Sequence, residues 1–236
     1  MKRGMAVTVV VAAIFSLLSC AKTGDTAGKT SLKDFTEKSS YALGMDFGSY
    51  VKGMPVDIDL ASLLQGLKDT VEERECLLTQ EEMSTVMMEF QQKVQEEGAK
   101  KRDGLSKTNI EEGRKFLEAN KTADGVVTTE SGLQYTVITE GDGPKPKATD
   151  VVSVHYLGTL LDGTEFDSSY KRGEPAGFQL DKVIPGWTEG VQLMSVGSKY
   201  RFFIPSELAY GERGGGQIIG PNATLIFEVE LLSIGE

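Results

Sequence analysis

The chain has 236 residues, enough for one or two domains, and its hydrophobic (39%) and charged (25%) fractions are those of an ordinary soluble protein. Its formal net charge of −10 argues against nucleic acid as a partner, because such a partner requires a lysine- and arginine-rich surface. With one histidine, His155, the chain lacks the usual ligands of a metal centre and the parts of a histidine-based catalytic set, so we expect no cofactor.

The N-terminus has the pattern of an export signal. Two basic residues precede an apolar run over residues 6–18, which is too short to span a membrane. The run ends in Leu17-Leu18-Ser19-Cys20, which resembles the bacterial lipobox, so we expect residues 1–20 to be a lipoprotein signal peptide and Cys20 to be lipidated. A plain secretory signal and an uncleaved anchor are the alternatives. By the same resemblance, Ala21 after the cysteine favours the outer membrane of a bacterial envelope.

After a small, polar stretch (residues 21–30) that we expect to be a flexible tether, residues 31–97 show helical periodicity. The first helix places Tyr41, Gly44, Met45 and Gly48 at helical spacing. The second has the apolar stripe Leu60, Leu63, Leu64 and Leu67, with Asp57 or Asp59 as its N-cap. The third begins at the capping box Thr79-Gln-Glu-Glu82 and carries the stripe Met83, Val86, Met87, Phe90 and Val94.

Three short helices form a small core, and folds below about 70–80 residues usually need additional support. We therefore expect dimerisation, with Tyr41, Met45, Met87 and Met88 as candidate interface residues. The alternative, that the methionine stripe is intramolecular core, is equally open. The lone Cys76 has no partner for an intramolecular disulfide once residue 20 is lipidated, and we expect it to be a buried small apolar residue.

Residues 98–122 are predicted to be a helical linker. Gly98, Gly104 and Gly113 weaken it by roughly 1 kcal/mol each relative to alanine. The sequence therefore allows one long helix or two helices broken near residues 98–104, with Asn109-Ile-Glu-Glu112 as a cap for the restart.

From residue 123 the hydrophobic period changes from 3.6 to 2, which predicts strands near residues 133–138, 151–156, 198–204 and 223–234, with Asp162-Gly163 as a hairpin turn. One short helix, from about Trp187 to Met194, is the only helical element expected in residues 123–236. The whole chain is then α+β: an all-helical module, a helical linker, and a curved antiparallel sheet wrapped on a short helix. The alternation places His155 opposite Tyr156, as an ordinary strand histidine.

Several short motifs follow one another in this C-terminal part. They are Val154-His-Tyr-Leu-Gly158, Asp162-Gly-Thr-Glu-Phe-Asp167, Phe178, Val183-Ile-Pro-Gly-Trp187, Leu208-Ala-Tyr-Gly211 and Ile218-Ile-Gly-Pro-Asn-Ala-Thr-Leu-Ile-Phe227. In this order and spacing they resemble the FKBP-type peptidyl-prolyl isomerases. The helical half resembles the N-terminal dimerisation module of the exported Mip/FkpA-like members, through Ser40-Tyr-Ala-Leu-Gly44 and Leu64-Gln-Gly-Leu-Lys68.

The resemblance implies a pocket lined by ten residues: Tyr156, Phe166, Asp167, Phe178, Val183, Ile184, Trp187, Tyr210, Ile219 and Phe227. Trp187 would be its floor, and the Ile184 N–H and the Tyr210 hydroxyl would bond substrate carbonyls. Asp167 would polarise the substrate or, as we favour, orient Tyr156. Two positions depart from the mammalian pattern: Ala176 replaces a phenylalanine, and Gly214-Gly215-Gly216 replaces a histidine-containing flap. Both are expected at the pocket rim, where they would affect ligand preference.

The implied activity is isomerisation of X–Pro bonds in proline-containing, unfolded or partly folded exported polypeptides, without a covalent intermediate. Macrolide inhibitors of the FK506 class would fill the same pocket. The alternative hypothesis is a chaperone, holdase or partner-binding module with incidental isomerase activity. A third hypothesis is a lipoprotein that binds a small ligand in the same cleft.

Overall fold

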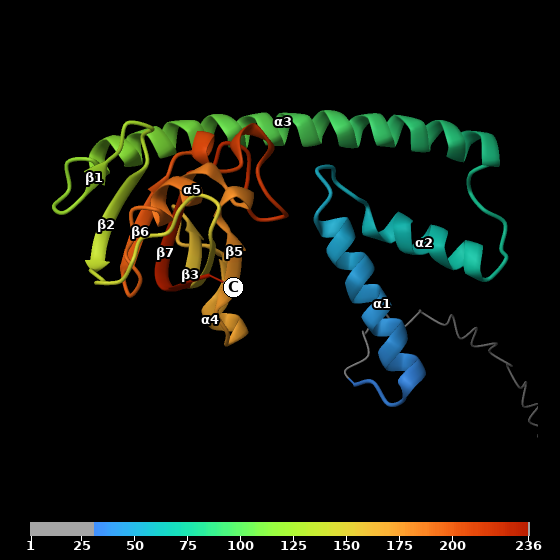
Figure 1. Ribbon diagram of the computed structural model, residues 1–236. Coiled ribbons are helices and arrows are strands. Elements are labelled where there is room, and N and C mark those ends of the chain that lie inside the picture. The colour runs from blue at the N-terminus through green and yellow to red at the C-terminus, as the bar shows by residue number, and fades with distance from the viewer. Residues whose placement is uncertain (1–30, 236) are drawn as a thin grey trace, which may run out of the picture. The chain divides into compact units, whose positions relative to one another are not determined.

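The computed structural model describes residues 31–235, so the expected signal peptide, Cys20 and the tether lie outside the described residues. Contacts between residues divide the chain into two compact units, one that ends at Lys52 and one that begins at Gly53. Figure 1 shows the helices and strands of both units. Within residues 31–235 no helix combines the length and apolar character that a membrane span requires.

The first unit contributes α1 (Phe35–Lys52). Asp34 Oδ1 accepts a hydrogen bond from the Glu37 N–H at 2.9 Å in its first turn. No residue of α1 is buried, and Tyr41 and Met45 are each 60% exposed. The apolar residues of α1 are therefore largely exposed within a single chain.

The second unit begins with α2 (Leu60–Val71). Of the two predicted N-caps, Asp59 is the one used, since its Oδ1 accepts from the Ser62 N–H at 2.7 Å. The stripe residues Leu60, Leu64 and Leu67 remain more than half exposed.

The helix α3 (Gln80–Asn120) runs for 41 residues without a break, which selects the single long helix from the two alternatives. The predicted capping box is confirmed: the Thr79 hydroxyl accepts from the Glu82 N–H, and Glu82 Oε2 accepts from the Thr79 N–H at 2.8 Å. The expected restart at Asn109 is wrong, because this side chain donates to the Pro221 carbonyl oxygen instead of capping a helix. Such tertiary contacts offset the weak helix propensity of the glycines.

The expected burial of Cys76 is also wrong. Cys76 is exposed, as is the whole connection from Glu72 to Thr79 between α2 and α3. The charged residues 72–75 directly before it favour solvent, and the adjacent Leu77 and Leu78 are exposed as well (86% and 50%).

The C-terminal domain is a seven-stranded antiparallel sheet of order β1-β2-β6-β7-β3-β4, with β5 also paired to β3. The strands are β1 (Val127–Thr128), β2 (Gln134–Thr139), β3 (Val151–Leu160), β4 (Glu165–Ser168), β5 (Ala176–Gln179), β6 (Lys199–Ile204) and β7 (Leu225–Ile234). Register shifts in β2 and at two points of β3 mark bulges, which bend a sheet. The predicted fold class is confirmed.

The core lies on one face of this sheet, as the alternation predicted. Every second residue of β3 from Val152 to Gly158, and of β7 from Leu225 to Leu231, is buried. The helix α5 (Pro185–Val191) covers this face with Trp187 and Val191. Close approach depends on Gly190, where a Cβ atom would lie 2.7 Å from the Phe202 ring.

α5 is not the only helical element of the domain, which corrects the prediction. α4 (Ser169–Arg172) follows β4, and the 3-10 turns η1 (Leu180–Lys182), η2 (Ser206–Leu208) and η3 (Gly211–Arg213) lie in the connections. Elements of three or four residues are too short to show a hydrophobic period, so the sequence pattern could not reveal them.

Candidate active site

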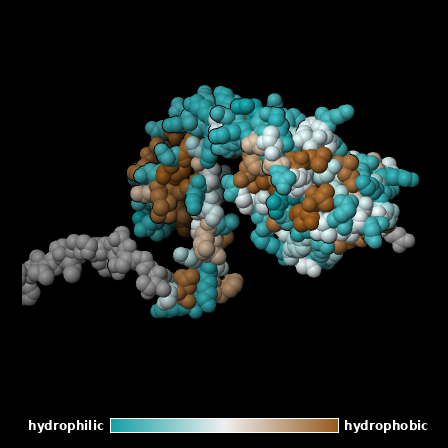
Figure 2. Space-filling model, turned by 90° about the vertical axis from the view of Figure 1, so that its left-hand side faces the viewer, coloured by the Kyte–Doolittle hydropathy of each residue, from teal (hydrophilic) through white to brown (hydrophobic). Residues whose placement is uncertain are grey.

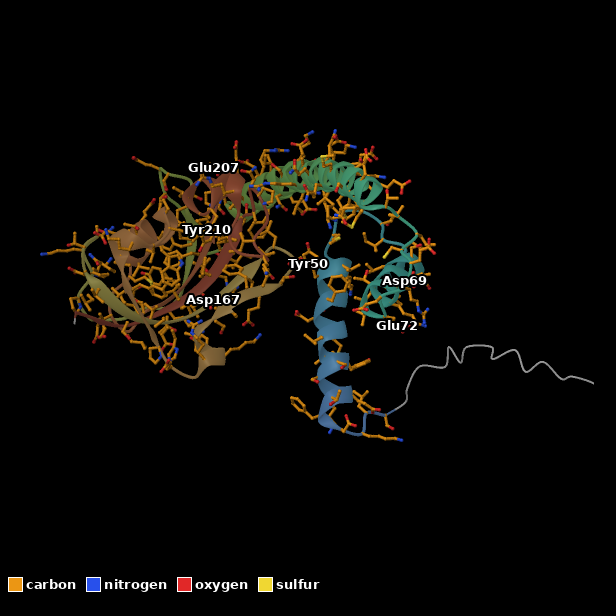
Figure 3. All side chains as sticks on the ribbon, turned by 90° about the vertical axis from the view of Figure 1, so that its right-hand side faces the viewer. Tyr50, Asp69, Glu72, Asp167, Glu207 and Tyr210 are labelled. Carbon is orange, nitrogen blue, oxygen red and sulfur yellow. The ribbon has the colours of Figure 1, made fainter. Side chains whose placement is uncertain are left out.

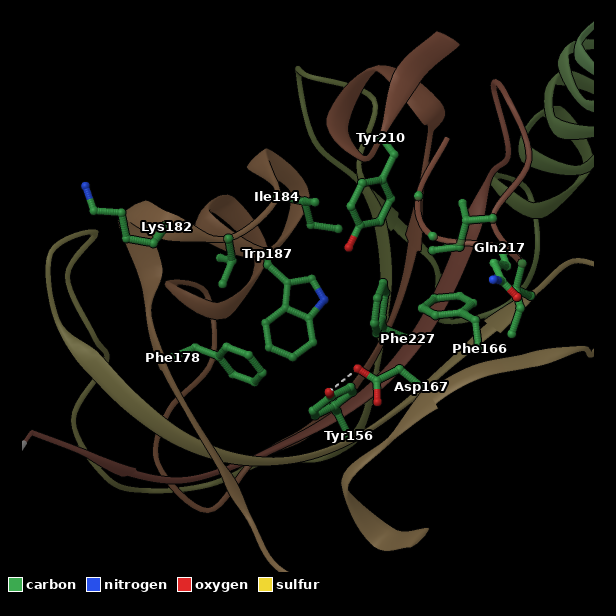
Figure 4. A pocket seen from close by; sticks show the side chains of 15 residues that line it. Tyr156, Phe166, Asp167, Phe178, Lys182, Ile184, Trp187, Tyr210, Gln217 and Phe227 are labelled. Atoms are coloured by element: carbon green, nitrogen blue, oxygen red, sulfur yellow. Dashed lines mark hydrogen bonds between the residues drawn. The ribbon is translucent and has the colours of Figure 1, made fainter. Parts of the chain in front are cut away.

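A cavity of about 660 Å³ opens between α5, the sheet and the loop after η3 (Figure 4). All ten residues expected in the pocket line it, and five further residues complete the wall: Lys182, Gly215, Gly216, Gln217 and Ile218. The lining is mainly apolar and aromatic with few polar groups, which is the usual character of a ligand site.

The floor is Trp187, which α5 holds in place. Pro185 occupies the first turn of α5, where its fixed φ suits a helix start, and the indole that follows is 3% exposed. The indole meets the rings of Tyr156, Phe178 and Phe227 edge to face, at centroid distances of 5.3, 5.3 and 5.2 Å. Four rings that fix one another make a rigid apolar surface. The indole N–H is buried without a hydrogen-bond partner among the described residues.

Polar groups converge at one side of the cavity. The Tyr156 hydroxyl donates to Asp167 Oδ2, while Arg172 donates from Nη1 to Asp167 Oδ1 at 2.5 Å and from Nη2 to the Tyr156 oxygen at 2.9 Å. Burial acts to raise the pKa of Asp167, but the hydrogen bonds from Tyr156 and Arg172 outweigh it and leave the pKa below its usual value. The carboxylate is therefore ionised, with both oxygens engaged by the protein.

Tyr156 and Arg172 respond in the opposite direction. Burial, and then the hydrogen bond to Asp167, raise the pKa of Tyr156, and the bonds to Tyr156 and Asp167 raise that of Arg172. Arg172 was not expected from the sequence. It lies in α4, whose N-cap Ser168 directly follows Asp167.

Tyr210 faces this cluster across the cavity, with its hydroxyl pointing inward (Figure 4). Figure 3 shows Tyr210 and Asp167 on different elements of the C-terminal domain. Burial, followed by the charge of Asp167, raises the pKa of Tyr210, so its hydroxyl stays protonated to a higher pH than that of a free tyrosine. This hydroxyl has no hydrogen-bond partner within residues 31–235, which leaves it available as a donor.

Ile184 supplies a second donor. It is the N-cap residue of α5, and its carbonyl oxygen accepts from the Trp187 N–H at 2.9 Å. Its own N–H has no acceptor in the described part of the chain. The cavity is thus an apolar pocket with two hydrogen-bond donors, the Ile184 N–H at the start of α5 and the Tyr210 hydroxyl.

Of the two departures expected at the pocket rim, the glycine flap is found there, since Gly215 and Gly216 line the cavity. The expectation fails for Ala176, which is not among the lining residues and packs against the core from β5. Tyr210 lies against Gly215, where a Cβ atom would come within 3.2 Å of its ring. Among residues 31–235, no three His, Cys, Asp or Glu side chains lie where they could hold a metal ion.

Known proteins resemble both halves of the chain. Residues 143–232 match the FKBP-type peptidyl-prolyl cis-trans isomerase family, and residues 36–137 match the domain amino-terminal to FKBP-type peptidyl-prolyl isomerase. The FKBP-type isomerase FkpA of Aeromonas hydrophila is 49% identical over 88% of this chain and 80% of its own length. The outer membrane protein MIP of Legionella longbeachae is 43% identical over 98% of both chains. The crystal structure of FkpA from Escherichia coli superposes with a TM-score of 0.66, at 38% identity, over 87% of this chain and 99% of that one.

Proposed function

The chain belongs to the FKBP-type peptidyl-prolyl cis-trans isomerases, and from this premise we propose that the cavity between Tyr156, Trp187 and Tyr210 is where it rotates X–Pro bonds. The observation that carries the proposal is the combination of a rigid aromatic floor with two donors, Ile184 N–H and Tyr210 O–H, that have no acceptor among residues 31–235.

The chemistry requires no nucleophile. Amide resonance sets a barrier of about 18–20 kcal/mol, and uncatalysed X–Pro isomerisation takes tens to hundreds of seconds. Rotation removes the resonance and reduces the dipole of the amide. An apolar, water-excluding pocket therefore disfavours the planar form relative to the twisted one. The aromatic floor formed by Trp187 and its neighbours supplies this environment.

The two donors hold the backbone on either side of the rotating bond. Hydrogen bonds from Ile184 and Tyr210 to substrate carbonyl oxygens hold the flanking peptide in place while the X–Pro bond rotates. Asp167 acts as an orienting group: its oxygens already accept from Tyr156 and Arg172, which keeps the Tyr156 ring against Trp187.

Proline-limited refolding of a model protein tests the site. Residues 21–236 should accelerate refolding, and a macrolide of the FK506 class should abolish the acceleration. Tyr210→Phe and Asp167→Leu should lower the rate while leaving suppression of aggregation intact. If aggregation is suppressed but a folded wild-type protein gives no acceleration, the holdase reading replaces the enzymatic role of this pocket.

The helical elements support a homodimer. The four candidate interface residues are 46–65% exposed: Tyr41, Met45, Met87 and Met88. Figure 2 shows hydrophobic surface over the N-terminal helices. The methionines are thus largely uncovered within one chain, which favours the interface over the intramolecular-core alternative. Light scattering should give twice the chain mass, and Tyr41→Glu combined with Met87→Glu should give a monomer with its isomerase activity retained.

We place the protein in the bacterial cell envelope, anchored by lipid on Cys20 and folding exported proteins. The lipobox-like sequence and the similarity to an outer membrane protein of Legionella longbeachae support this location. Fractionation of cells grown with labelled palmitate should find label in the membrane-bound wild type and none in Cys20→Ala. Label that persists in the variant would contradict the anchor.

A further inference from the structure

One wall of the cavity is a loop whose two ends are held by α3. We define the pocket loop as residues 211–222. Its middle, residues 215–219, lines the cavity. Its base is closed by a hydrogen bond from the Asn222 N–H to the Gly211 oxygen (2.8 Å), and its middle by a pair of bonds between Gly215 and Ile219 (2.8 and 3.1 Å).

The sequence of the pocket loop does little to fix its conformation. Gly214, Gly215 and Gly216 are consecutive, and the first and third have φ of +68° and +58°. Glycine loses more conformational freedom on ordering than any other residue. Three hydrogen bonds across the loop are little compensation for this loss of freedom, so its shape depends on contacts from outside.

Those contacts come from one face of α3. Arg102 Nη2 donates to the carbonyl oxygens of Glu212 (3.0 Å) and Arg213 (3.1 Å), just before the glycines. Asn109 Nδ2 donates to the Pro221 oxygen at 2.7 Å, just after them. Arg102 and Asn109 are seven residues apart, two helical turns, and so lie on the same face.

The helix and the loop are in direct contact between these two points. Ser106, on the same face, accepts from Asn222 Nδ2 at 2.8 Å. A Cβ atom at Gly220 would lie 2.8 Å from Leu105 Cδ2 and 3.2 Å from Asn109 Nδ2. The loop backbone therefore rests against α3 with no room for a side chain between them.

We propose that Arg102 and Asn109 are positioning residues of the isomerase, through which α3 holds the pocket loop in its binding conformation. This inference rests on the proposed site and adds a determinant of its substrate affinity. Neither residue lines the cavity, so any influence on catalysis passes through the loop.

The expected kinetic signature follows from when the loop is ordered. A loop fixed during folding adds no ordering cost when substrate binds, whereas a loosened loop adds the same cost to the substrate complex and to the transition state. Loss of the anchor should therefore raise KM, with kcat nearly unchanged.

The test uses Arg102→Ala, because Arg102 is exposed and its replacement should leave the fold intact. KM for a short proline peptide and Kd for a macrolide of the FK506 class should rise by about threefold to tenfold, and Arg102→Lys, which keeps a donor, should recover part of the loss. Asn109→Leu should act in the same direction. The matched control is Lys101→Ala, which removes the same charge from the neighbouring exposed position and should behave as wild type.

Hydrogen exchange separates this role from a general loss of stability. In Arg102→Ala the Gly215 and Ile219 amides should exchange faster, while the amides of β3 and β7 stay protected. Unchanged KM, Kd and exchange in Arg102→Ala and Asn109→Leu, beside an active wild type, would overturn the inference and leave the proposed site standing. An inactive but folded wild type would instead refute the site itself.

Discussion

Gly158 on β3 offers a direct test of how closely the sheet supports the pocket. Its Cβ position lies 2.6 Å from two atoms of the Phe166 ring and 2.8 Å from the Phe227 ring, and both rings line the cavity. Ordinary contact begins near 3.4 Å, so Gly158→Ala requires the Phe166 ring to retreat by about 0.8 Å (3.4 minus 2.6).

The cost can be bounded from general values. Overpacking a core site typically costs about 1–3 kcal/mol. Removing a glycine from a strand recovers roughly 0.5–1 kcal/mol. The net loss for Gly158→Ala is then about 0–2.5 kcal/mol, and at about 2–4 °C per kcal/mol for a chain of this size the Tm should fall by up to roughly 10 °C.

Both displaced rings line the cavity, so we expect their movement to narrow it. We expect the KM for a proline peptide and the Kd for a macrolide to rise by about tenfold, equivalent to about 1.4 kcal/mol. Urea denaturation and the isomerase assay measure the two effects. Gly177→Ala on β5 is the matched control, since nothing lies within 4 Å of its Cβ position, and it should alter neither stability nor binding appreciably. Reduced stability of Gly158→Ala with unchanged KM would show that the rings retreat away from the pocket and would refute this reasoning.

Three further changes probe the polar groups. Tyr210→Phe should lower kcat/KM by about tenfold, the value of one hydrogen bond, with little change in urea denaturation because the hydroxyl bonds no described residue. The folded-state pKa of Asp167 is depressed, so the stability that its ionised form contributes is present above the unfolded pKa of about 3.9 and is lost as the pH falls through the folded pKa. The difference in free energy of unfolding between wild type and Asp167→Asn should therefore shrink below about pH 4, and a constant difference would contradict the ionised state. Burial and then the bond to Glu140 raise the pKa of Tyr200 to about 12, so its contribution to the free energy of unfolding is intact below the unfolded pKa of about 10 and is lost as the pH rises through 12. Between about pH 10 and 12, Tyr200→Phe should therefore lose less of its neutral-pH stability than wild type does, which alkaline denaturation measures.

Local patterns in the sequence were sufficient for most of the fold. The period-2 alternation in β3 and β7 identified the buried faces because successive strand side chains point to opposite sides. The capping box at Thr79 located the start of α3 because both of its hydrogen bonds lie within four residues. Each of these features depends on neighbours in the chain, which is why they could be inferred without the structure.

Features that depend on distant partners could not be inferred. Arg172 reaches Tyr156 and Asp167 only because β3 and β4 pair and α4 turns back over them. Asn109 had the sequence pattern of a helix cap, but its partner, Pro221, is 112 residues away. The glycines of residues 214–216 were expected at the pocket rim from the family resemblance alone, whereas the support that α3 gives the pocket loop could not be inferred.

The exposure of Cys76 has a practical consequence for following this protein in solution. It is the one cysteine among residues 31–235, and it lies outside the cavity. Within residues 31–235, a maleimide dye should therefore attach at a single known point without entering the cavity. Trp187, the sequence's only tryptophan, lies at the cavity floor and provides an intrinsic fluorophore there. One chain thus carries two separate optical reporters, one at the cavity and one on the connection between α2 and α3.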